Sequence, residues 1–163
     1  MSGCGCDTLK ASLASFDEAM ESLLACARTT TETEVVDTVS ALGRVLAGPL
    51  VSTVNVPPLD NSAMDGYAVS SQDVTQSGVT LPVSQRICAG EVGQTLEAGT
   101  AARIFTGAPV PANADAVIMQ EFCEQQGSMV TINQIARSRQ NIRKAGEDIA
   151  AGDRILDTGA RLR

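Results

Sequence analysis

The residues best suited to chemistry lie between positions 57 and 68 of this chain of 163 residues. Two carboxylates, an amide and a hydroxyl fall within six positions, as Asp60, Asn61, Ser62 and Asp65. The proline pair before them and the glycine after them predict a restrained loop, and a rigid loop with clustered acids can hold a metal ion or a reacting group. The alternative is an ordinary turn, because Asp, Asn and Ser side chains also bond their own backbone.

A second candidate segment is the loop that opens at Thr106 and Gly107, where a strand-like run ends. The threonine hydroxyl can donate a hydrogen bond to a phosphate oxygen, and the glycine allows a ligand to approach the backbone closely. The same two residues could instead form a turn that only ends the strand. Spacing alone does not decide between these two interpretations.

A third candidate is a short basic run that contains Arg137, Arg139, Arg143 and Lys144. Guanidinium groups bind phosphate through paired hydrogen bonds, so this run can form an anion site. Residues 1–136 hold 15 acids and 5 bases, whereas residues 137–163 hold 4 acids and 7 bases, and the contrast favours such a site. The alternative is a charged face that simply contacts water.

The composition excludes several classes of protein and site. Without any histidine or tryptophan, the chain cannot supply Ser-His-Asp or Cys-His catalysis or a His-ligated zinc site. Its five cysteines, an odd number without CxxC spacing, predict no disulfide framework, although Cys4 and Cys6 could bind a soft metal. The formal charge of -7 argues against nucleic-acid or membrane partners, because both surfaces are anionic. No signal-peptide core or membrane-spanning apolar run is present, which predicts a cytoplasmic protein.

The pattern of apolar residues predicts a mainly β fold with a few helices, of the α+β class. Ser15 and Glu18 have capping-box spacing, and the apolar residues that follow predict an amphipathic helix over residues 16–28. Alternation predicts a strand over residues 33–39, followed by a short helix over residues 41–47. Short strands separated by turn residues are predicted over residues 50–56, 66–69, 81–89, 101–105, 116–121, 129–135 and 154–156.

Three motifs, at residues 57–68, 103–111 and 146–149, together resemble the molybdopterin molybdenumtransferase family, to which the gephyrin E domain belongs. They occur in the family's order and at its spacing, and the resemblance runs from about residue 16 to residue 163. Family members are much longer. The chain is therefore expected to be an N-terminal portion that lacks the family's nucleotide-fold and β-barrel domains.

The resemblance also implies how the chain is divided. A tail and the amphipathic helix, residues 1–30, would precede an elongated lobe built from residues 31–51 and 144–163. A β-rich lobe, residues 52–143, would be inserted between those two segments. Only two chain crossings would join the lobes, so their relative orientation could vary.

The activity implied by the resemblance is a transferase reaction of molybdenum cofactor biosynthesis. Family members take molybdate and adenylylated molybdopterin, insert molybdenum and release AMP with the help of a divalent cation such as Mg²⁺. Such a site needs oxygen ligands for a hard cation and donors for phosphate oxygens. Asp65 is implied as a catalytic residue and metal ligand, and Thr106 as a second catalytic residue. The candidate substrate-binding residues are Asn61, Ser62 and Gly107, which lie in the family motifs, and Arg137, Arg139 and Arg143, which are chosen for their phosphate-binding chemistry.

Alternatives remain open for both the site and the whole chain. Asp65 could simply form an Asp-Gly turn that fixes the entry to a strand. In the family the cleft forms between two subunits, so a homodimer is expected, and the chain alone is expected to be inactive. The alternative function is a non-catalytic pterin-binding or scaffold module.

Overall fold

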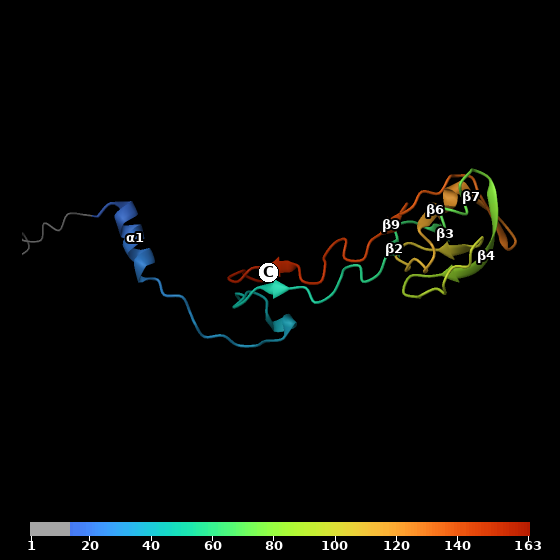
Figure 1. The fold of residues 1–163 in the computed structure, drawn as a ribbon. Coiled ribbons are helices and arrows are strands. Elements are labelled where there is room, and N and C mark those ends of the chain that lie inside the picture. Colours follow the sequence, from blue (N-terminus) through green and yellow to red (C-terminus); the bar gives the residue numbers. More distant parts are fainter. Residues whose placement is uncertain (1–13) are drawn as a thin grey trace, which may run out of the picture. The chain divides into compact units, whose positions relative to one another are not determined.

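The computed structural model describes residues 14–163, and the chain divides after Leu42 into two units. Helix α1 (Phe16–Cys26) belongs to the first unit, and the strands belong to the second, Gly43–Arg163 (Figure 1). None of the helices formed by residues 14–163 has the length and apolar character that crossing a membrane requires.

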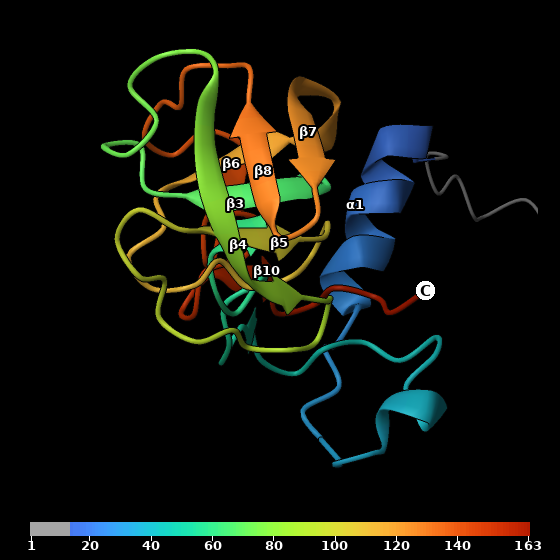
Figure 2. The same cartoon turned by 90° about the vertical axis from the view of Figure 1, so that its right-hand side faces the viewer.

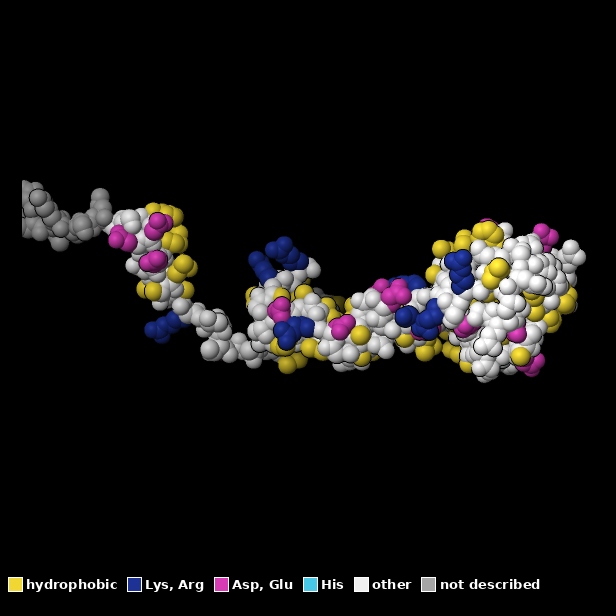
Figure 3. Space-filling model, turned by 45° about the horizontal axis from the view of Figure 1, so that its top comes forward, with side chains coloured by type: hydrophobic (Ala, Val, Ile, Leu, Met, Phe, Trp, Pro, Cys, Tyr) yellow, Lys and Arg dark blue, Asp and Glu magenta, His cyan; other side chains and the backbone are white. Residues whose placement is uncertain are grey.

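Helix α1 begins at the predicted capping box. Ser15 Oγ accepts a hydrogen bond from the Glu18 N–H at 3.2 Å, and Glu18 Oε2 accepts one from the Ser15 N–H at 2.8 Å. The helix ends at Cys26, slightly before its predicted end at residue 28. Its apolar side chains lie along one side and its acids along another (Figure 3), and none of its residues is buried. The predicted amphipathic helix is therefore confirmed, with its apolar face exposed.

The predicted strand over residues 33–39 is wrong. Residues 29–37 are irregular, and a short 3-10 helix, η1 (Thr38–Ser40), follows them. A strand needs a neighbour that shares backbone hydrogen bonds, and no strand described in residues 14–163 pairs with this segment. Alternation of side chains was thus not sufficient to form a strand.

The predicted helix over residues 41–47 is also wrong. The N–H groups of Gly43 and Leu46 donate to the carbonyls of Leu162 and Ala160, at 2.9 Å each. The segment therefore pairs with a distant part of the chain instead of forming helical bonds within itself. Local periodicity does not contain this information.

Two segments far apart in the sequence form a narrow ribbon. Strands β1 (Leu50–Val51) and β10 (Arg154–Leu156) run antiparallel in it, side by side in Figure 1. An isolated bridge between Val56 and Ile149 extends the pairing. β1 covers only the start of the strand predicted over residues 50–56, whereas β10 matches its prediction. The proposed division into two lobes stays a prediction.

The main sheet has six strands in the order β6-β3-β5-β4-β8-β7. Neighbouring strands are antiparallel, apart from the parallel pair of β4 and β5. Figure 2 shows that the sheet is curled, with β4 crossing in front of β3. The six strands are β3 (Gly66–Val69), β4 (Val79–Ile87), β5 (Ala101–Ile104), β6 (Ala116–Met119), β7 (Cys123–Gln126) and β8 (Met129–Ile132).

The expected mainly β fold with few helices is confirmed. Each strand of the main sheet except β7 was predicted close to its observed place. A second 3-10 helix, η2 (Gln120–Phe122), replaces the end of the strand predicted over residues 116–121. β7 was missed because its sequence, Cys-Glu-Gln-Gln, has no apolar alternation, and at the edge of the sheet it needs none.

Apolar side chains pack on both faces of the main sheet. Tyr67 and Val69 belong to one buried cluster, and Ala68 belongs to the other with Ile87 and Ile104. Successive side chains of a strand point to opposite faces of the sheet. Both faces are covered by apolar side chains, so all four residues of β3 are buried. β3 is therefore a firm base for the loop that precedes it, which ends at Asp65.

Candidate active site

Asp65 and Thr106, the two residues implied as catalytic, contact each other directly. Asp65 Oδ1 accepts a hydrogen bond from the Thr106 backbone N–H at 2.8 Å and another from the Thr106 hydroxyl at 2.7 Å. These two bonds, with a smaller effect from the charge of Arg103, hold the pKa of Asp65 below its usual value. Asp65 is thus ionised at neutral pH. Its other oxygen, Oδ2, accepts no hydrogen bond from residues 14–163.

The backbone around Asp65 is fixed by the close approach of two strands. Its carbonyl accepts a hydrogen bond from the Gln120 N–H at 3.0 Å. A Cβ atom on Gly66 would lie 1.9 Å from the carbonyl oxygen of Ile118, so this position requires glycine. The turn interpretation therefore explains Gly66. It does not explain the Asp65 carboxylate, which bonds across to Thr106 instead of to its own turn.

The two predicted loops lie side by side. The Gly107 N–H donates to the Ser62 carbonyl at 2.9 Å, and the Ser62 N–H donates to the Ala108 carbonyl at the same distance. Gly107 has a φ of 81°, a conformation that L-residues with side chains rarely adopt. The sequence placed candidates on both loops, and the fold brings those loops together.

Short strands also connect the first loop to the basic run. β2 (Asn61–Ser62) pairs antiparallel with β9 (Ile142–Arg143), and the Asp60 carboxylate accepts a bond from the Ala145 N–H at 2.8 Å. Neither strand was predicted, because two residues carry no periodicity.

Asn61 and Ser62 differ in how their side chains are used. Asn61 Oδ1 is buried and has no hydrogen-bond partner within residues 14–163. A buried acceptor without a partner costs about 1–3 kcal/mol, so Asn61 offers an oxygen that a ligand donor can satisfy. The hydroxyl of Ser62, a residue only 1% exposed, already donates to the Met64 carbonyl. Ser62 therefore shapes the loop.

Two of the three predicted arginines have carboxylate partners. Arg139 lies 3.5 Å from Asp60, and Arg143 bonds to Asp148 and Glu147. The hydrogen bonds that Arg143 donates to Asp148 and, with a smaller effect, to Glu147 raise the pKa of Arg143. These ion pairs are well exposed, and exposed pairs are worth about 0–1 kcal/mol. A phosphate group can therefore compete for either arginine.

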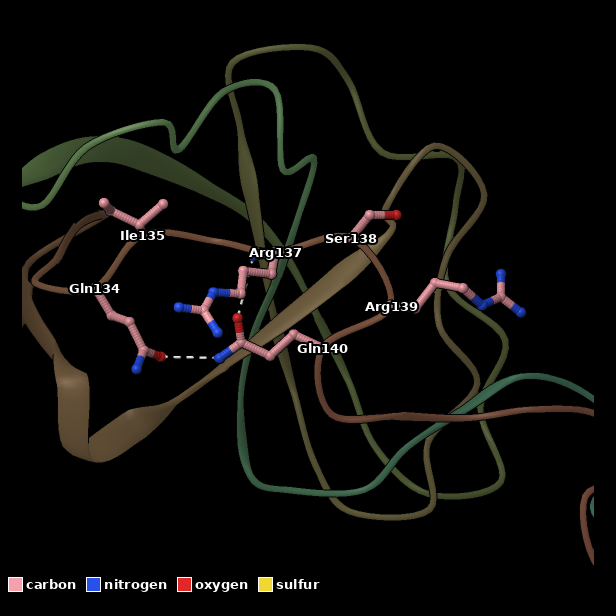
Figure 4. A pocket seen from close by; sticks show the side chains of 6 residues that line it. All are labelled: Gln134, Ile135, Arg137, Ser138, Arg139 and Gln140. Atoms are coloured by element: carbon pink, nitrogen blue, oxygen red, sulfur yellow. Dashed lines mark hydrogen bonds between the residues drawn. The ribbon is translucent and has the colours of Figure 1, made fainter.

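Arg137 lies at a hollow of about 850 Å³ (Figure 4). The backbone N–H of Arg137 donates to Gln140 Oε1 at 3.1 Å, and Gln140 Nε2 donates to Gln134 Oε1 at 2.9 Å. In Figure 4 the Arg137 side chain lies beside Gln140, whereas Arg139 points away from both. Arg137 and Arg139 therefore do not converge on one anion position.

Arg103 is a site residue that the sequence reasoning missed. Its guanidinium donates to the Gly66 carbonyl at 3.0 Å and to Gln120 Oε1 at 2.6 Å. It also lies over the rings of Phe105 and Tyr67, at 4.6 and 5.2 Å from their centres. Arg103 thus braces the backbone next to Asp65. The signal was an arginine inside a strand of otherwise apolar residues, which requires a dedicated partner.

The protein groups available to a metal ion are few. Within residues 14–163 no three or more His, Cys, Asp or Glu side chains are grouped so as to hold one. Mg²⁺ commonly binds to one or two carboxylates together with water and substrate phosphates. Asp65 Oδ2 suits that kind of site as its single carboxylate oxygen. The possible soft-metal pair, Cys4 and Cys6, lies outside the described residues.

Residues 14–163 match the family described as the MoeA N-terminal region (domain I and II). The chain belongs to this family. MoeA relatives include the molybdopterin molybdenumtransferase of Haemophilus influenzae, 40% identical over 149 residues, which are 90% of this chain. Molybdopterin molybdenumtransferase 2 of Mycobacterium tuberculosis is 44% identical over 124 residues, which are 73% of this chain. These matches cover only 37% and 31% of the two relatives.

A solved MoeA structure has the same fold. The crystal structure of the molybdopterin biosynthesis MoeA protein from Pyrococcus horikoshii OT3 matches with a TM-score of 0.84 and 35% identity, over 90% of this chain and 40% of that one. The resemblance carried by the three motifs is therefore confirmed. The chain spans about two fifths or less of the length of these relatives.

Proposed function

We propose that this chain is the N-terminal part of a cytoplasmic molybdopterin molybdenumtransferase. The full-length protein would insert molybdenum from molybdate into adenylylated molybdopterin and release AMP. The contact between Asp65 and Thr106 carries this proposal, because it joins two motifs that the family resemblance had marked separately. The names of the MoeA relatives support the same reaction class.

In this proposal Asp65 is held ionised and correctly turned by Thr106. With Oδ1 fixed by both Thr106 donors, Oδ2 is left to face a cation or an attacking water. A bound Mg²⁺ would neutralise charge on the phosphate oxygens. The residue in this chain that would hold it is Asp65, with further ligands from substrate and from other parts of the protein.

The substrate would be bound by polar groups around these two loops. Asn61 would accept a hydrogen bond from the pterin through its unpartnered Oδ1. Gly107 would allow close approach to the backbone, and Ser62 would keep the loop in shape. Arg137, Arg139 and Arg143 would bind anionic oxygens, with Arg139 and Arg143 exchanging exposed carboxylate partners for phosphate.

The cleft would be completed by a second subunit and by the parts of the family fold beyond this chain. The chain alone should therefore bind parts of the substrate without turning it over. A non-catalytic pterin-binding module would have no turnover for the Asp65–Thr106 pair to support. A measurement of turnover therefore distinguishes the two functions.

The test is Asp65→Asn in the full-length protein, measured as molybdenum insertion. Loss of one electrostatic group at a reacting centre typically lowers the rate by about a hundredfold or more, and we expect a loss of that order. Asp115 is a matched control, because its two oxygens accept bonds from the backbone N–H and the hydroxyl of one residue, Ser71. Asp115→Asn should reduce stability and leave insertion by the folded protein unchanged. Normal insertion by a folded Asp65→Asn protein would refute the proposal.

A further inference from the structure

Two arginines and a phenylalanine form a layer at the edge of the candidate active site. Arg86 and Arg103 are register partners on the parallel strands β4 and β5, so their side chains leave the same face of the sheet. Both guanidinium groups lie against the ring of Phe105, at 4.8 and 4.6 Å from its centre. A hollow of about 570 Å³ opens here, lined by Val83, Gln85, Arg86, Arg103, Phe105 and Gln125.

Neither arginine of this layer forms an ion pair with a carboxylate of residues 14–163, although the charge of Arg103 acts on Asp65 from a distance. Arg103 donates to two neutral oxygens, the Gly66 carbonyl and Gln120 Oε1. Arg86 is exposed and makes no hydrogen bond or ion pair within residues 14–163. Its guanidinium group has a cation–π contact with the Phe105 ring. Arg139 and Arg143 differ in this respect, because each already has a carboxylate partner.

A contact with an aromatic ring does not take up the hydrogen-bond donors of a guanidinium group. Arg86 lies over the Phe105 ring, and no group within residues 14–163 accepts a hydrogen bond from its guanidinium. Those donors can bind two oxygens of a phosphate group through parallel hydrogen bonds. Less side-chain freedom is lost on binding, because the arginine is already oriented.

We propose that this hollow is a phosphate-binding site, with Arg86 as the anchoring residue and Arg103 as a second positive charge. The site adjoins the proposed reacting groups, since Phe105 directly precedes Thr106 and Arg103 bonds the carbonyl of Gly66, next to Asp65. The identity of the ligand rests on the proposed function: the bound group would be a phosphate of the pterin substrate. Molybdate is also a tetrahedral oxyanion, so the experiment must distinguish the two.

The experiment titrates the 163-residue chain with inorganic pyrophosphate, and separately with molybdate, while NMR follows the arginine Nε–H signals. We expect pyrophosphate to shift the Arg86 and Arg103 signals at concentrations at which molybdate does not. Arg86→Gln should weaken pyrophosphate binding by about tenfold or more, the usual loss for one charge-assisted hydrogen-bonded pair. Arg86→Lys should bind with intermediate affinity, because it keeps the charge and loses the planar fork.

Arg28→Gln is the matched control, because Arg28 is also exposed, has no carboxylate partner within residues 14–163 and does not line the hollow. It removes the same charge and should leave the affinity within about twofold. Equal affinities of Arg86→Gln and wild type, a loss only with Arg137→Gln, or a preference for molybdate would each overturn the phosphate assignment. The titration involves no turnover, so its failure would leave the Asp65 test of the proposed function standing.

Discussion

At the scale of single residues, the Asp65–Thr106 pair shows how one side chain sets the state of another. Thr106 supplies two donors to one carboxylate oxygen, so it both lowers the pKa of Asp65 and fixes the direction of Oδ2. Because the pKa of Asp65 is lower in the folded state than in the unfolded state, this interaction stabilises the fold at every pH above the unfolded-state pKa. The contribution is lost as the pH falls through the lowered folded-state pKa.

Removing the hydroxyl of Thr106 should therefore raise the pKa of Asp65. Thr106→Val keeps the backbone donor and loses the side-chain donor, so the pKa should move part of the way back toward its usual value. Thr106→Ser retains a hydroxyl and should titrate like wild type. A ¹³C NMR titration of the Asp65 carboxyl measures both. If Thr106→Val and wild type titrate alike, the hydroxyl does not control the charge of Asp65.

At the scale of elements, the site depends on how closely β3 and β6 approach each other. Gly66 opens β3 opposite Met119, and its missing side chain leaves room for the Ile118 carbonyl. The close approach brings the Gln120 N–H to the Asp65 carbonyl. Strand pairing, rather than the loop alone, thus sets the position of the carboxylate.

Gly66→Ala should separate these strands. Its Cβ would lie 1.9 Å from a backbone oxygen that no side-chain rotation can move away, and such overpacking typically costs about 1–3 kcal/mol. Gly48→Ala is the control, because nothing lies within 4 Å of a Cβ there and its φ is not positive. Urea unfolding should show a clear loss for Gly66→Ala and little change, or a small gain, for Gly48→Ala. Equal stabilities would mean that β3 and β6 adjust without cost.

At the scale of the whole molecule, the exposed apolar side of α1 needs a cover. The side chains of Phe16, Leu23 and Leu24 are 76%, 69% and 66% exposed. Burying each large apolar side chain is worth about 1.5–3 kcal/mol, so this face favours association. The expected homodimer would provide the cover and would also supply the second wall of the cleft.

Leu23→Glu should therefore shift the 163-residue chain from dimer to monomer, because it places a charge in the middle of the apolar face. Glu21→Gln, on the same exposed helix, should leave the dimer intact. Light scattering over a range of concentrations measures both. A wild-type chain that remains a monomer at high concentration would show that α1 does not drive dimerisation.

The sequence alone determined the features that depend on near neighbours. The capping box of α1, the strand pattern of residues 66–69 and the family motifs around Asp65 and Thr106 are all local, and all could be predicted. Their physical basis lies within a few residues, in caps, alternation and turn chemistry. The same local patterns failed over residues 33–47. No described strand pairs with residues 33–39, and Gly43 and Leu46 bond to a distant backbone segment instead of within their own segment.

Tertiary structure decided which of these local features meet. Only the fold places the Thr106 donors on Asp65, Arg103 against Gly66, and Arg86 beside Arg103 on two parallel strands. It also points Arg137 and Arg139 of the basic run in different directions (Figure 4), although sequence proximity had suggested that they would act together. Each of these contacts joins residues from different strands or loops, and its geometry follows from strand register. Register depends on hydrogen bonds between distant segments, which no single stretch of sequence contains.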